Sequence, residues 1–210
     1  MISKTRRPHP AVAAKPASRL GGTLGNERLT ASLGGLLFVL LAVLGLTIPS
    51  VHSLLYEHVY LGMLLIPPVL LKMGSTGYRF VRYYTGHRAY REGGPPAPLL
   101  RMIAPLVVLS TVAVFGSGVM LLVLGPGAGL MRGLHQASFI LWFGVTTIHV
   151  LAYVQRVPAL VGADWRGTDR RVGGSLERRL LVAASVAAGI VLASLTVRYA
   201  QPWASAFRFH

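Results

Sequence analysis

The segment LHQASFILWFGVTTIHVLAYV, residues 134–154, is apolar enough to cross a membrane and yet carries two histidines, His135 and His149. Thirteen residues separate them. On an α-helix a step of fourteen residues turns through about 1400°, roughly 40° short of four full turns, and rises about 21 Å. Both imidazoles are therefore expected on one face of a helix, near opposite sides of a bilayer. Ionisable side chains inside a spanning helix are costly, so the segment is predicted to contribute to a functional site.

A second segment, YEHVYLGMLLIPPVLLK at residues 56–72, repeats this spacing with His58 in the first place and Lys72 in the last. Pro67 and Pro68 lie between the two and are expected to kink the helix, because each removes an amide donor and crowds the preceding turn. How Lys72 faces relative to His58 therefore stays open.

The composition places the chain in a membrane. Of its 210 residues 53% are hydrophobic and only 13% are charged, which is too apolar for a soluble domain of this length. The net charge is +15, and the lysines and arginines responsible for it lie mainly in the segments between the apolar runs. This pattern indicates membrane topology, and no nucleic-acid partner is expected. Cysteine is absent, which excludes disulfides, thiolate ligands, iron–sulfur clusters and covalent haem attachment.

Five apolar runs predict an all-α integral membrane bundle, with a transmembrane domain over residues 28–200. Residues 1–27 are predicted to form a disordered basic arm, and residues 201–210 a short outer tail. Glycine, proline and polar residues predict loops at 85–101 and 156–179. The predicted spans are residues 29–48, 54–76, 103–124, 134–155 and 180–198.

The positive residues predict the orientation. With five spans, seventeen of the twenty-one lysines and arginines fall on the side of the N-terminus. Positive loops mark the cytoplasmic side, so a plasma-membrane protein with a cytoplasmic N-terminus and an extracytoplasmic C-terminus is expected. Spans two and four then run inward from the outer side. His58 and His135 share an outer level, and Lys72 and His149 share a deeper one.

Ligands that project from facing helices are how helical bundles hold metals and cofactors. A histidine on each face of a porphyrin would fix the iron, leave no open position and favour electron transfer. Because cysteine is absent, the expected cofactor is a noncovalent haem b, with His58, His135 and His149 as candidate metal ligands. Gly62, one turn after His58, would give the porphyrin room or simply allow close helix packing. Arg132, one turn before His135, is either a partner for haem propionates or a solvated interfacial arginine.

These residues resemble the membrane cytochromes of the cytochrome b561 and ferric-reductase-like kind, in which two helices each carry two histidines thirteen residues apart. The resemblance covers residues 52–156 and implies a four-helix core that stacks two haems across the membrane. Lys72 stands where the fourth histidine of that pattern should be. One haem at His58 and His135 is favoured. A second haem at His149, or a propionate or quinone oxygen at Lys72, stays open.

The first functional hypothesis is an electron-transfer cytochrome b subunit or anchor. It would take electrons from a quinol or a cytoplasmic donor and pass them to an outer redox partner. No nucleotide-binding motif is found, so a complete enzyme is not expected. The alternative is a cofactor-free transporter or proton relay that uses the same three histidines and Lys72, although Glu57 is the only carboxylate inside a predicted span. A third hypothesis is structural: the histidines only form hydrogen bonds to neighbouring helices. Of the other histidines, His52 and His87 are expected at interfaces or in solvent, and His9 and His210 lie in the tails.

Overall fold

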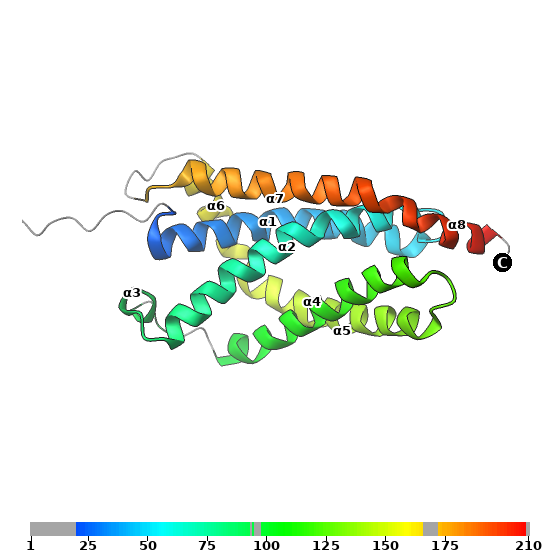
Figure 1. The fold of residues 1–210 in the computed structure, drawn as a ribbon. Helices are drawn as coiled ribbons and strands as arrows, with labels where there is room; N and C mark the ends of the chain where they lie inside the picture. Colours follow the sequence, from blue (N-terminus) through cyan, green and yellow to red (C-terminus); the bar gives the residue numbers. More distant parts are fainter. Residues whose placement is uncertain (1–19, 93, 95–97, 166–171, 209–210) are drawn as a thin grey trace, which may run out of the picture.

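The computed structural model describes residues 20–92, 94, 98–165 and 172–208, and this part of the chain is all-helical, without strands (Figure 1). The elements in chain order are α1 (Gly22–Thr47), η1 (Ile48–Ser50), α2 (Leu55–Tyr84), α3 (Arg88–Arg91), α4 (Pro98–Leu124), α5 (Gly129–Tyr153), η2 (Val154–Arg156), α6 (Val157–Trp165), α7 (Ser175–Thr196), η3 (Val197–Ala200) and α8 (Gln201–Arg208).

Five helical segments are long and apolar enough to cross a membrane, which confirms the predicted number of spans and indicates a multi-pass membrane protein. All five are longer than the apolar runs that predicted them, because each helix continues into flanking residues at one or both ends. The segments are Gly22–Ser50, Leu55–Tyr84, Arg101–Leu124, Gly129–Tyr153 and Ser175–Phe207.

The N-terminal arm was predicted too long. Residues 22–27 belong to α1, while residues 1–19 lie outside the described residues. Arg178, almost fully buried, donates hydrogen bonds to the carbonyl oxygens of Leu20 (2.9 Å) and Gly173 (2.7 Å), which ties the start of α1 to the start of α7. This tertiary contact begins the helix earlier than hydropathy indicates, and it places Glu27 inside a spanning helix.

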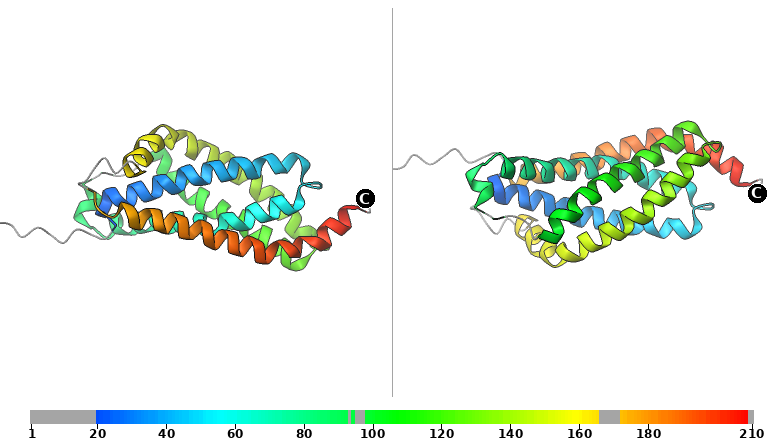
Figure 2. Two further views of the ribbon diagram at one scale, coloured as in Figure 1. Left: turned by 90° about the horizontal axis from the view of Figure 1, so that it is seen from above. Right: turned by 90° about the horizontal axis from the view of Figure 1, so that it is seen from below.

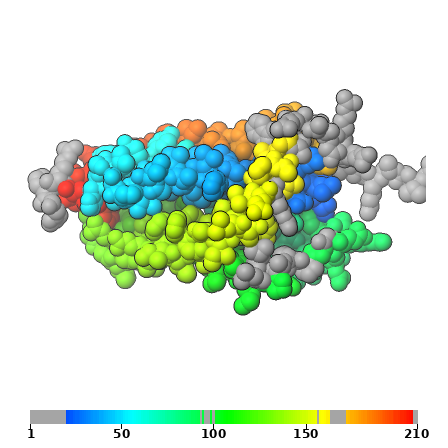
Figure 3. Space-filling view, turned by 180° about the vertical axis from the view of Figure 1, so that it is seen from behind, coloured from blue at the N-terminus to red at the C-terminus, as the bar shows by residue number. Residues whose placement is uncertain are grey.

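The outer tail was also predicted incorrectly, because residues 201–208 form α8. Trp203 is buried and packs with Leu55 and Ala200, so α8 has an apolar face against the bundle. The predicted loops likewise contain the short helices α3 and α6. α6 packs across α1, where a Cβ on Gly35 would lie 3.4 Å from Cγ1 of Val157 (Figure 3).

The spanning helices form two groups. α2 packs mainly against α1 and α7, whereas α5 packs mainly against α4. Figure 2 shows α1 and α7 nearest the viewer from above and α4 with α5 nearest the viewer from below. Among its described side chains α5 buries only Ser138, so most of its surface is not covered by the other helices.

α2 and α7 approach each other closely at a proline. Pro67 and Pro68 lie inside α2, which continues through both as one helix, and Pro68 has no amide to donate to the carbonyl of Leu64. Gly189 of α7 faces this same carbonyl, and a Cβ there would overlap the Leu64 oxygen. The glycine therefore lets the two backbones meet where the proline has freed an acceptor.

Candidate functional site

The predicted outer pair consists of His58 and His135, one residue from each helix group. His58 lies in the first turn of α2 and His135 in the second turn of α5, and these turns are at the same end of the bundle (Figure 1). Both side chains are half-buried, and the two imidazoles are close enough to interact electrostatically. The residues that helical spacing placed at one level thus lie at the same end of the bundle.

Hydrogen bonds fix the tautomer of His135. Its Nδ1 lies 3.0 Å from the carbonyl oxygen of Val114 and 3.2 Å from Oγ of Ser117, both on α4. A carbonyl oxygen can only accept a hydrogen bond, so Nδ1 carries the proton. In the neutral ring Nε2 then holds the lone pair, which is the form that binds a metal ion.

The same reasoning applies to His58 through a different partner. Its Nδ1 lies 2.8 Å from Oγ1 of Thr47 in the last turn of α1. The Thr47 hydroxyl donates its hydrogen to the carbonyl oxygen of Leu44 at 2.6 Å. Its oxygen is therefore an acceptor toward His58, so Nδ1 is again protonated and Nε2 again holds the lone pair.

Gly118 on α4 makes room for the His135 ring. A Cβ at this position would lie 3.1 Å from Cε1 and 3.5 Å from Nδ1 of His135. Sequence reasoning did not identify Thr47, Val114 or Ser117 as site residues. The only signal of Thr47 and Ser117 is a hydroxyl inside an apolar run, which is common in membrane helices, and the Val114 carbonyl has no signal in the sequence.

The inner pair is built differently. Lys72 and His149 are close enough to interact electrostatically, but Nζ of Lys72 donates to the carbonyl oxygen of Thr30 on α1 at 3.0 Å. A Cβ on Gly34 would lie 3.1 Å from the same Nζ. The buried Nδ1 of His149 has no hydrogen-bond partner within the described residues, and its ring packs against Tyr153 at 5.0 Å. Neither tautomer of His149 is therefore fixed by the protein.

The remaining predicted residues lie around the outer pair or at the ends of the bundle. Gly62 faces open space, since a Cβ there would meet nothing within 4 Å. The Arg132 guanidinium lies over the rings of Trp203 and Phe207, at 5.7 and 5.8 Å. His52 and His87 are exposed, as expected for interfacial residues. His9 and His210 lie outside the described residues.

Two neutral imidazoles with free Nε2 atoms suit the axial positions of a metalloporphyrin, which needs only two protein ligands. They do not suit a metal ion held by protein alone, because the described residues contain no group of three or more histidine, cysteine or acidic side chains that could hold one. Comparison with known proteins gives no independent guide: no family model, curated protein or solved structure matches the chain.

Proposed function

We propose that this chain is a haem b-binding electron-transfer protein of the membrane, with His58 and His135 as the axial ligands of one haem between α2 and α5. The observation that carries the proposal is that each ring, from a different helix group, is hydrogen-bonded through Nδ1 and leaves Nε2 as its free nitrogen. Both rings thus offer Nε2 as a possible iron ligand, although different helices hold them in place.

The residues around the rings support a redox role. A histidine ligand almost always donates its other ring N–H to an acceptor, which fixes its orientation and raises its basicity. Thr47 does this for His58, and the Val114 carbonyl does it for His135. A haem held by both histidines would supply one-electron exchange. Gly62 leaves space beside His58, as a porphyrin edge requires.

The direction of electron flow follows from the predicted topology and is part of the proposal. The histidine pair would lie near the extracytoplasmic face of the plasma membrane, where it would reduce an outer redox partner. Electrons would enter from a quinol or a cytoplasmic donor. The chain would serve as the haem-carrying subunit or anchor of a larger oxidoreductase system.

The electrostatic interaction between Lys72 and His149 favours proton movement as a second candidate function. Ser32, Thr146 and His149 each hold a buried polar atom without a hydrogen-bond partner among the described residues, and water could bridge such atoms. A relay would use these groups and would need no cofactor. The fixed tautomers of His58 and His135 have no purpose in a relay, because a relay histidine must exchange the proton on either nitrogen.

An absorption spectrum of the purified protein from a haem-sufficient host tests the proposal. We expect a Soret band with sharp α and β bands on reduction, and one haem per chain by pyridine haemochromogen assay. His58→Ala and His135→Ala should each abolish the spectrum. His87→Ala, at an exposed histidine, is the matched control and should keep it.

His149→Ala separates one haem from two, because it should leave the haem content at the wild-type value. A halved content would establish a second, inner haem. A wild-type protein that is folded and free of haem, or a His58→Ala protein with a wild-type spectrum, would rule out the proposed site.

A further inference from the structure

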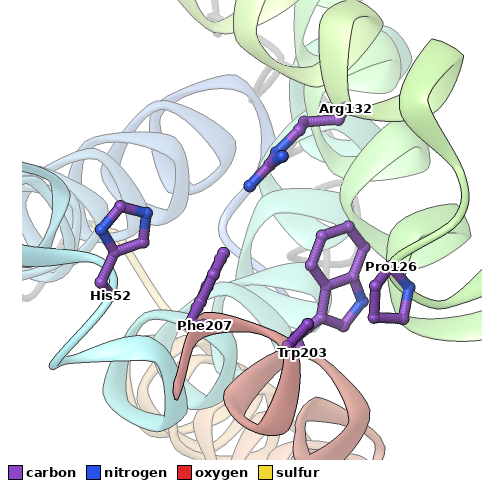
Figure 4. A pocket seen from close by; sticks show the side chains of 6 residues that line it. His52, Pro126, Arg132, Trp203 and Phe207 are labelled. Atoms are coloured by element: carbon purple, nitrogen blue, oxygen red, sulfur yellow. The ribbon is translucent and has the colours of Figure 1, made fainter. Parts of the chain in front are cut away.

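A cavity of about 420 Å³ opens at the end of the bundle where α2 and α5 begin, the end that carries His58 and His135. Figure 4 shows the Arg132 side chain reaching from α5 toward the space between His52 and the rings of α8. Ligand pockets for small molecules usually enclose about 300–1,000 Å³, so the cavity is large enough for a ring system of two or three fused rings. Its lining residues are His52, Pro126, Arg132, Trp203, Ala206 and Phe207.

The aromatic walls of the cavity are fixed in place. Trp203 is buried to 7% exposure, and its Nε1 donates to the carbonyl oxygen of Leu121 at 3.0 Å. Phe207 packs edge to face against His52, with ring centroids 4.4 Å apart, and lies 6.2 Å from the Trp203 ring. These rings come from α8 and from the turn before α2, so the cavity exists only in the folded chain. Preformed flat walls favour a planar ligand.

Arg132 supplies a positive charge with unused donors. Its side chain is exposed, and it makes no ion pair or hydrogen bond within the described part of the chain. The two rings beneath hold the guanidinium over the cavity through cation–π contacts, which involve its face and leave its N–H groups free. A guanidinium in this state is suited to bidentate binding of a carboxylate, sulfonate or phosphate.

We propose that this cavity binds a small planar aromatic molecule that carries an anionic group, with the anion on Arg132 and the ring system between the aromatic walls. Arg132 is one turn from His135, and His52 is six residues before His58, so the bound molecule would lie next to the proposed haem. Its role as the outer electron-exchange partner rests on the proposed function, whereas its binding does not.

Anthraquinone-2-sulfonate is the probe, with the uncharged 2-(hydroxymethyl)anthraquinone as its matched control. Binding to the full-length protein in phosphatidylcholine nanodiscs is followed by quenching of tryptophan fluorescence. Saturable binding of the sulfonate, at least about tenfold tighter than that of the uncharged ring, is the expected result. This comparison needs only the wild-type protein. Equal affinities, or no saturable binding of the sulfonate, would overturn the proposal.

Variants then assign the site. Arg132→Gln should weaken binding of the sulfonate about tenfold. Arg198→Gln, which removes an exposed arginine stacked on Tyr199 at 5.1 Å, should leave it unchanged. Trp203→Phe should remove most of the quenching signal. If Arg132→Gln lowers haem content and leaves sulfonate binding intact, Arg132 belongs to the haem site and the proposal fails.

Two further measurements separate the possible occupants. His58→Ala, which removes the proposed haem ligand, should still bind the sulfonate, and loss of binding would place the probe at the haem position and refute the cavity assignment. In phosphatidylglycerol nanodiscs the affinity should be close to that in phosphatidylcholine. A loss of binding specific to phosphatidylglycerol would mean that lipid headgroups occupy Arg132, which contradicts a soluble planar ligand.

Discussion

The hydroxyl of Thr47 holds the His58 ring in the tautomer that an iron ligand needs, and valine has nearly the same shape without the oxygen. We expect Thr47→Val to weaken haem retention about 10- to 100-fold, because the ring loses the acceptor that orients it. The midpoint potential of the remaining haem should rise, since a less basic imidazole stabilises ferric iron less. Thr47→Ser should restore both properties.

Haem content during dilution and a spectroelectrochemical titration measure these two effects. Thr147→Val is the control, because the Thr147 hydroxyl is exposed and bonds to the Phe143 carbonyl of its own helix. An unchanged potential in Thr47→Val, with full haem content, would show that this hydrogen bond does not support a ligand.

Two glycines of α4, two residues apart, offer a second residue-level test. A Cβ on Gly118 would press against the His135 ring at 3.1 Å, whereas a Cβ on Gly116 would meet nothing within 4 Å. Gly118→Ala should therefore displace the ring at a cost of about 1–3 kcal/mol and lower haem content. Gly116→Ala should behave as wild type in the same pyridine haemochromogen assay. If the two variants are indistinguishable, the ring position is not set by α4.

Spacing alone was enough to predict that His58 and His135 lie at the same end of the bundle, because helical periodicity fixes which residues of a helix share a face and a level. The hydrogen-bond partners of the rings could not be predicted in this way. Thr47 and the Val114 carbonyl belong to other helices, and their positions depend on how α1 packs on α2 and α4 on α5. Lys72 shows the same limit, since its bond to α1 could not be inferred from the helix that carries it.

At the scale of elements, the contact between α2 and α7 depends on one glycine. Gly189→Val would place a side chain against the Leu64 carbonyl that Pro68 leaves without its helical donor. We expect a loss of stability of about 3 kcal/mol, because neither backbone can move without separating the helices. Gly45→Val is the control in α1, where a Cβ meets nothing within 4 Å.

Thermal unfolding in detergent, followed by circular dichroism, compares the two variants. An equal melting temperature for Gly189→Val and the wild type would mean that α7 is not held at this position. Haem content should fall in Gly189→Val only to the extent that unfolding occurs, since α7 supplies no ligand in the proposed site.

Helix number was easier to predict than helix length. Hydropathy identifies the apolar centre of a span, whereas the ends are set by contacts that it cannot measure. Arg178 binds the Leu20 carbonyl just before α1, so the helix begins at Gly22. Trp203 packs against Leu55 and Ala200, so residues 201–208 form a helix against the bundle. Trp203 and Phe207, which form the aromatic walls of the cavity, were missed for the same reason, because α8 was predicted as a tail.

For the whole molecule, the orientation in the membrane decides which partners the site can reach. The chain has no cysteine, so single cysteines can report the side of each loop. Ser53, in the turn between η1 and α2, and Thr85, just after α2, are both exposed and lie at opposite ends of the bundle. Because most positive residues lie on the side of Thr85, Ser53→Cys should react with an impermeant maleimide in intact cells. Thr85→Cys should react only after permeabilisation. The reverse pattern would put the histidine pair and the Arg132 cavity on the cytoplasmic face, where a planar anion would be an electron donor from the cell interior instead of an external partner.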